Sequence, residues 1–134
     1  MLDKVGLVVS IWVRFARVKA LLGRGDLSGV TRELGKPPSN PRRGRHPIHL
    51  GRAVWKALSP GPLRPRCLPV ALVHYRLLIE QGLPAELVIG LPDQAERIDA
   101  HAWVEIDGID VGPPPGRGGR VPLARYGPEG PATS

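Results

Sequence analysis

Residues 67 to 91 read CLPVALVHYRLLIEQGLPAELVIGL, and this stretch decides the fold class. From 67 to 81, apolar residues recur at the i, i+3, i+4 and i+7 spacing of a helix. Gly82 and Pro84 end that helix. Residues 86 to 91 then predict a strand. A long apolar helix that leads directly into strands predicts an α+β fold, with the helix packed on a small antiparallel sheet.

A second stretch, residues 100 to 112 (AHAWVEIDGIDVG), predicts a β-hairpin. Its apolar and aromatic residues suit a strand, and the Asp-Gly pair at 107–108 is a favoured two-residue hairpin turn. Side chains alternate between the two faces of a strand. We therefore expect His101, Trp103, Glu105 and Asp107 on one face.

We expect one domain over residues 1–134, because the chain has room for a single core. Composition divides it into a helical region at 1–59, a helix–strand core at 60–112 and a Pro/Gly-rich irregular tail at 113–134. Only the segment 121–126 of that tail is expected to be anchored. The helical region contains three predicted helices: 4–22, a short helix capped by Asp26 that ends at Leu34, and 49–58.

Charge and cysteine content narrow the classes of partner and compartment. The net charge is +7, but aromatic residues are only 4% of the chain, too few to interleave with the basic ones as in a single-strand binder. We predict a solvated basic face and no nucleic-acid binding. The apolar run at 5–13 is too short to span a membrane, and no signal-peptide cleavage site follows it. The single cysteine excludes an intrachain disulfide and a multi-cysteine zinc site. We expect a cytoplasmic protein.

The position of Cys67 suggests a catalytic nucleophile. Cysteine catalysis needs a thiolate, and the positive end of a helix dipole lowers the pKa of a thiol. The unpaired N–H groups of a helix start can also hold an oxyanion. Cys67 stands at a predicted helix start, with Arg64 and Arg66 before it. By itself a free cysteine is more often a buried structural residue, so a second observation is needed.

A base for this nucleophile is expected to be a histidine from another element. Of the four histidines, His46 and His49 lie in or beside a loop. His74 falls in the middle of the predicted helix, two turns after the cysteine. His101 lies in the predicted strand, beside Trp103, and is the best candidate.

These residues together resemble the transglutaminase-like superfamily, whose site combines a helix-start Cys, a strand His and an Asp from the next strand. More narrowly, the chain resembles the stand-alone leader peptidases of lasso-peptide biosynthesis, which are related to the C-terminal part of microcin-processing proteins. The resemblance rests on the motifs Cys67-Leu68-Pro69, Gly82-Leu83-Pro84-Ala85 and His101-Ala102-Trp103-Val104-Glu105 before Asp107-Gly108. It implies a transglutaminase-like or papain-like cysteine peptidase core with N-terminal helices.

The third catalytic residue departs from the family pattern. The family usually places its Asp about a dozen positions after the His, where this chain has Pro113. Asp110 is the acid on the expected return strand, and the resemblance assigns it the role. In a regular hairpin, however, Asp110 lies opposite Glu105, about 14 Å along the strand from His101, so a bulge or a longer loop is required. The alternatives are Asp99, a backbone carbonyl, or an unaided Cys–His pair.

The resemblance implies that the chain removes the leader from a ribosomally made lasso-peptide precursor. It implies as partners the precursor peptide, a small leader-binding recognition protein and the ATP-dependent macrolactam synthetase. No metal or organic cofactor is implied. Two other functions stay open at this point: acyl transfer to an amine by the same residues, and a non-catalytic peptide-binding module of the same fold.

Overall fold

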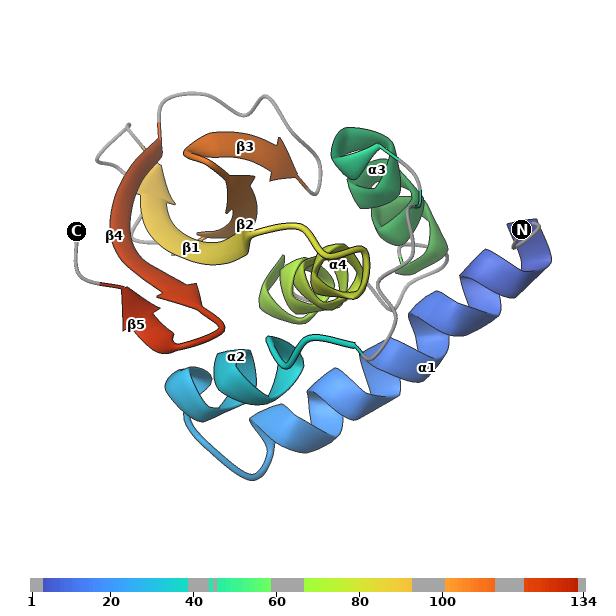
Figure 1. The fold of residues 1–134 in the computed structure, drawn as a ribbon, viewed down its shortest axis with the longest axis horizontal. Coiled ribbons are helices and arrows are strands. Elements are labelled where there is room, and N and C mark those ends of the chain that lie inside the picture. The colour runs from blue at the N-terminus through green and yellow to red at the C-terminus, as the bar shows by residue number, and fades with distance from the viewer. Residues whose placement is uncertain are drawn as a thin grey trace.

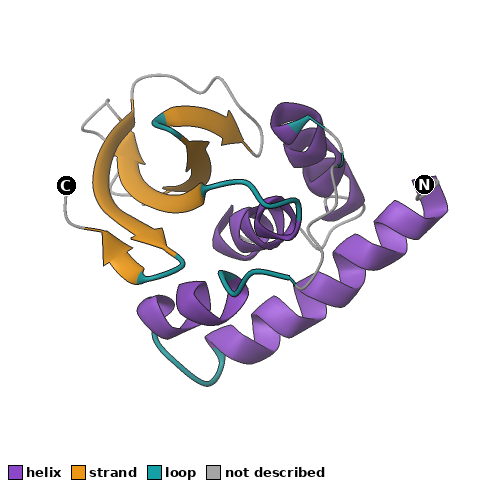
Figure 2. Ribbon diagram, viewed as in Figure 1, coloured by secondary structure: helices purple, strands orange, loops and turns teal. Residues whose placement is uncertain are grey.

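The computed structural model describes residues 4–38, 44, 46–58, 67–92, 101–112 and 120–132. The helices are α1 (Lys4–Leu22), α2 (Leu27–Leu34), α3 (Pro47–Leu58) and α4 (Cys67–Glu80). The strands are β1 (Ala85–Pro92), β2 (His101–Ile106), β3 (Ile109–Gly112), β4 (Arg120–Gly127) and β5 (Gly130–Ala132). Helices and strands gather on opposite sides of the molecule (Figure 2), which confirms the predicted α+β class.

Helix α4 is the central element of the fold. It contacts α1, α2, α3, β1 and β2, and Figure 1 shows it enclosed between the curved sheet and the other helices. A helix that is apolar on nearly every side is stable only where every side is covered. Its buried apolar side chains are Val70, Ala71, Leu72, Val73, Tyr75, Leu77, Leu78 and Ile79.

The predicted N-terminal helices are confirmed, with one shifted boundary. Helix α1 has the predicted limits, and Asp26 caps α2 by accepting a hydrogen bond from the N–H of Gly29 at 2.9 Å. Helix α3 begins at Pro47, two residues earlier than predicted. The reason is local: proline suits the first turn of a helix, and Nδ1 of His46 accepts a hydrogen bond from the N–H of Ile48.

The sheet is antiparallel, in the order β3-β2-β1-β4-β5, and it curves strongly (Figure 1). The predicted turn between β2 and β3 is confirmed. Asp107 has φ 52° and Gly108 has φ 81°, and two consecutive positive φ angles are the geometry of the favoured two-residue hairpin. Helix α4 packs on β1 and β2, as the sequence predicted.

The predicted irregular tail after residue 113 contains two strands within residues 120–132, of which only the segment 121–126 was expected to be anchored. These residues form β4 and β5, and β4 pairs along β1 from Leu87–Tyr126 to Pro92–Arg120. The pairing is irregular between Ile89 and Gly90, next to Pro122. Local composition indicates a loop because proline and glycine weaken strands. The partner strand supplies hydrogen bonds that no local pattern records.

Candidate active site

Cys67 is the first residue of α4, so the predicted helix start is confirmed. Pro69 lies in the first turn, where its missing N–H removes no helical hydrogen bond. The first turn contains no acidic side chain. An anion at this helix end therefore meets the positive end of the dipole, without a neighbouring carboxylate on α4 to oppose it.

His101 is the first residue of β2, and its side chain is half-buried. It pairs with Gly90 near the far end of β1. Only four residues join α4 to β1, and the two elements contact each other, so β1 runs back along the helix. The helix is about 20 Å long, and Ala85 to Gly90 spans about 17 Å. The topology thus puts the starts of α4 and β2 toward the same end of the molecule.

The two faces of β2 have different surroundings. Ala102 and Val104 belong to the core formed with the helices. Strand alternation therefore assigns His101 to the other face, together with Trp103. His101 is therefore not part of the buried interface between α4 and the sheet.

Asp110 lies away from the start of β2. It pairs with Glu105, four positions from His101, which corresponds to about 14 Å along the strand. The ladder does contain an irregularity, but it falls after Asp110, because Val104 pairs with Gly112. The Asp110 carboxylate accepts a hydrogen bond from the N–H of Gly112 at 2.8 Å. The register does not bring Asp110 and His101 together.

A buried ion pair on the His101 face of the sheet was not predicted from the sequence. Glu105 is 6% exposed, and its carboxylate accepts a hydrogen bond from Nε1 of Trp103 at 2.8 Å and forms an ion pair with Arg125. Arg125 comes from β4 and lies opposite Val88 on the intervening strand β1. The alternation of β2 predicted that Trp103 and Glu105 share a face. Arg125 falls in the segment 121–126, which was expected to be anchored, but nothing local predicted its ion pair with Glu105.

His74 is excluded as the base by its surroundings. It is fully buried, and Nε2 makes a hydrogen bond to the carbonyl oxygen of Pro47 at 2.9 Å. Burial lowers the pKa of His74 to about 4, although the backbone of Pro47 and, more weakly, that of Gly112 favour its charged form. Its ring packs so tightly on α3 that a Cβ at Gly51 would lie 2.7 Å from Cε1 of His74. His74 is a neutral core residue.

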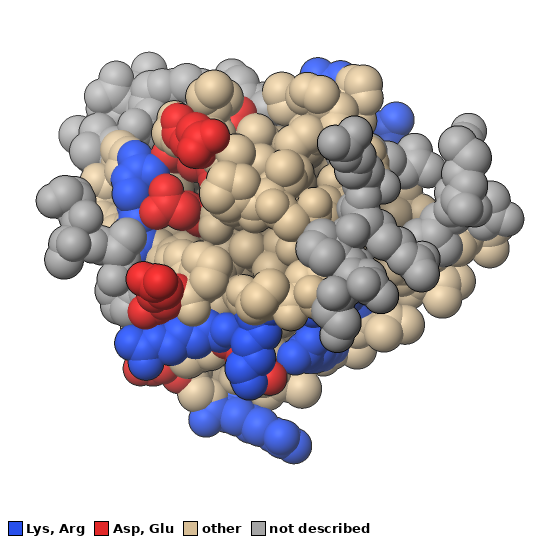
Figure 3. Space-filling view, in the orientation of Figure 1, with Lys and Arg blue, Asp and Glu red and all other residues tan. Residues whose placement is uncertain are grey.

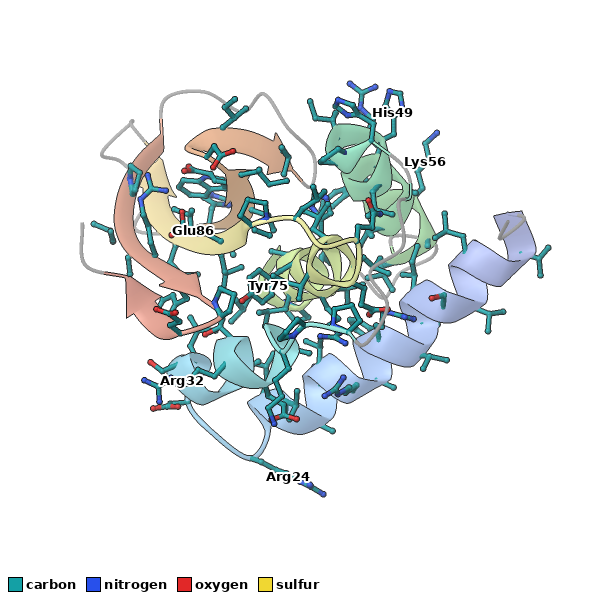
Figure 4. The ribbon with its side chains drawn as sticks, in the orientation of Figure 1. Arg24, Arg32, His49, Lys56, Tyr75 and Glu86 are labelled. Carbon is teal, nitrogen blue, oxygen red and sulfur yellow. The ribbon has the colours of Figure 1, made fainter. Side chains whose placement is uncertain are left out.

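The remaining predicted positions add no further site. The rings of His46 and His49 lie 5.4 Å apart on the exposed start of α3, and Figure 4 shows His49 pointing away from the sheet. Asp99, Arg64 and Arg66 lie outside the described residues. Within the described ranges, no three His, Cys, Asp or Glu side chains are grouped so that they could hold a metal ion.

Comparison with known proteins gives one match. The family model of the transglutaminase-like superfamily matches residues 9–122, which include Cys67, His101 and Asp110. Members of this superfamily are generally enzymes of the cysteine peptidase or acyltransferase type. No curated protein and no solved structure matches the chain. In the part of the chain that the structure describes, no helix has the length and apolar character needed to cross a bilayer.

Proposed function

We propose that this chain, which belongs to the transglutaminase-like superfamily, is a cysteine peptidase that removes the leader from a ribosomally made lasso-peptide precursor. One observation carries the catalytic part of this proposal: the single cysteine of the chain is the first residue of the central helix α4. Helix starts favour thiolates and hold anions.

The proposed reaction uses Cys67 and His101 in two steps. The imidazole of His101 accepts the thiol proton, and the Cys67 sulfur attacks the carbonyl carbon at the end of the leader. The oxyanion that forms is held by first-turn N–H groups of α4; Pro69 offers none. His101 then protonates the leaving amine, which frees the core peptide. Water, deprotonated by His101, hydrolyses the thioester and releases the leader with a carboxylate end.

The group that orients His101 is either Asp110 or Asp99, or the Cys–His pair acts without one. In the register described above, Asp110 could reach the imidazole only if β3 slipped along β2. We propose that the Cys–His pair meets near the start of β2, which favours an orienting group from the residues just before His101 or an unaided pair. Asp99, two residues before His101, has the required carboxylate.

The substrate class rests on the resemblance of the motifs at 67–69, 82–85 and 101–108 to stand-alone leader peptidases. In such systems a small leader-binding protein presents the precursor, and an ATP-dependent macrolactam synthetase receives the freed core peptide. A reducing cytoplasm suits a thiol nucleophile. The direct test incubates the chain with a candidate lasso-peptide precursor and a candidate leader-binding protein. Mass spectrometry should find the leader and the core peptide as separate products.

The register of Asp110 favours a second candidate, a peptide-binding module of the same fold that does not cleave. Under this alternative the chain binds the precursor, but the mass of the precursor stays unchanged. Acyl transfer is distinguished in the same assay: with a primary amine present, a transferase yields a leader that carries the amine as an amide. Release of the leader as a free acid supports the peptidase.

A further inference from the structure

Helix α1 exposes an apolar stripe that the fold leaves uncovered. We define the outer stripe as Val5, Val8, Val9, Trp12 and Val13, whose exposed fractions run from 42% to 71%. Their spacing is that of one helix face, and they account for five of the seven exposed large apolar side chains among the described residues. The opposite face of α1, with Leu7, Ile11 and Val18, is buried in the core. The stripe is therefore not needed to hold α1 on the fold.

The shape of the stripe suits a rigid protein surface. Four of its side chains are valines, whose χ1 angles are already restricted in a helix, so little side-chain entropy is lost when they are covered. The fifth is Trp12, whose ring packs edge-on against Phe15 with the centroids 5.4 Å apart. A tryptophan held by its neighbour is a typical anchor of protein interfaces.

Charge indicates which chemistry the partner presents. Helix α1 contains no Asp or Glu. Arg17 makes only an exposed ion pair with Glu33 at 3.3 Å, and Lys19 forms no ion pair among the described residues. Lys56 points outward from α3 on the same side of the molecule as the N-terminal half of α1 (Figure 4). The basic side chains thus lie mainly beyond the C-terminal end of the stripe, where Lys19 continues the face of Trp12. Figure 3 shows basic side chains, with acidic ones among them, along the edge formed by α2 and the end of α1.

A second copy of the chain fits this surface poorly. Whether two α1 helices paired in parallel or antiparallel, neither would bring a carboxylate to oppose Arg17 and Lys19 of the other. Like charges across an interface disfavour association. A lipid surface would attract the basic residues, but helices that lie on membranes expose a polar face rich in Lys and Arg, with larger apolar residues opposite. The second face of α1 is instead buried in the protein core.

We propose that the outer stripe of α1 docks a partner protein that presents an apolar groove, rimmed by Asp and Glu side chains at the end that meets Arg17 and Lys19. This proposal rests on the proposed function in one respect: the partner is the protein that brings the precursor to Cys67. The apolar contact supplies affinity, and the acidic rim supplies orientation and a fast association rate.

The test measures binding of each small protein encoded beside this chain, purified separately, to the full chain carrying Cys67→Ala. Val9→Glu and Val9→Lys remove the same apolar contact but carry opposite charges. Against an acidic rim, Val9→Glu should weaken binding about 100-fold and Val9→Lys about 10-fold. Leu123→Glu is the matched control, because Leu123 in β4 is 61% exposed and lies outside the stripe; it should change affinity less than about twofold.

Four results would overturn the proposal: no binding by any of these proteins, equal losses for Val9→Glu and Leu123→Glu, a dimer of the chain that Val9→Glu dissociates, or sedimentation with anionic phosphatidylserine vesicles that Val9→Glu abolishes. Thermal unfolding of each variant checks that it is folded. Binding needs no cleavage, so the proposed function can fail separately: a partner that binds the stripe while the wild-type chain leaves the precursor intact would refute the peptidase and keep the docking surface.

Discussion

Helices α1 and α4 have similar apolar sequences and opposite surroundings. Helix α4 is covered by three helices and the sheet, and eight of its apolar side chains are buried. Helix α1 is covered along one face only and exposes its outer stripe. Apolar character on every side predicts that a helix needs covering, but not what covers it. The fold does not cover the outer face of the first half of α1, and we expect a partner protein to cover it.

The largest effect is expected at the first residue of α4. Cys67→Ala removes the nucleophile and should lower leader cleavage by at least about 10⁴-fold, with the unfolding temperature nearly unchanged. His101→Ala should behave similarly, whereas His49→Ala, on the exposed start of α3, should cleave normally. The measurement is the cleavage rate by mass spectrometry. Cleavage by Cys67→Ala at the wild-type rate would refute the assignment.

A second prediction compares the two helices directly. Leu72→Ala removes a fully buried side chain of α4 and should reduce the free energy of unfolding by about 3 kcal/mol. Val13→Ala removes one that is 62% exposed on α1 and should change it by less than about 0.5 kcal/mol. Urea unfolding of the isolated chain measures both. Equal losses would mean that the outer stripe is already covered in the isolated protein.

A third prediction uses the histidine buried in α4. The pKa of His74 is lowered by burial from 6.5 to about 4. Between these pH values the unfolded chain binds a proton that the folded chain does not, so stability falls as the pH falls from 6.5 to 4. This contribution is about 3 kcal/mol. Between pH 7 and pH 4, the free energy of unfolding should fall by about 3 kcal/mol less in His74→Gln than in the wild-type chain. In His49→Gln it should fall by the same amount as in the wild-type chain.

The smallest effect is expected at the edge of the sheet. With Asp110 opposite Glu105, Asp110→Asn should lower kcat less than about 10-fold, because the carboxylate lies about 14 Å along the strand from His101. Asp99→Asn, measured beside it, shows whether the acid before the strand takes the role. A loss of several orders of magnitude in Asp110→Asn alone would restore the predicted triad and would require β3 to slip during turnover.

The sequence by itself determined the elements whose signals are local. Periodicity and end signals located α1, α2 and α4 to within a residue, and the Asp107-Gly108 pair predicted its turn, because helix ends and tight turns depend on neighbouring residues. The same local signal placed Cys67 at a helix start and His101 in a strand, which are the residues that carry the proposed chemistry.

Only the tertiary structure decided what depends on distant partners. β4 and β5 exist because β4 pairs with β1, and Arg125 becomes the partner of Glu105 only through that pairing. The local turn at Asp107-Gly108 already predicted Asp110 opposite Glu105, and only the structure shows that the irregularity of the β2–β3 ladder falls past Asp110. The exposure of the outer stripe is likewise a property of how helices pack. Long-range pairing and burial arise from contacts between segments far apart in the chain, so no window of sequence contains them.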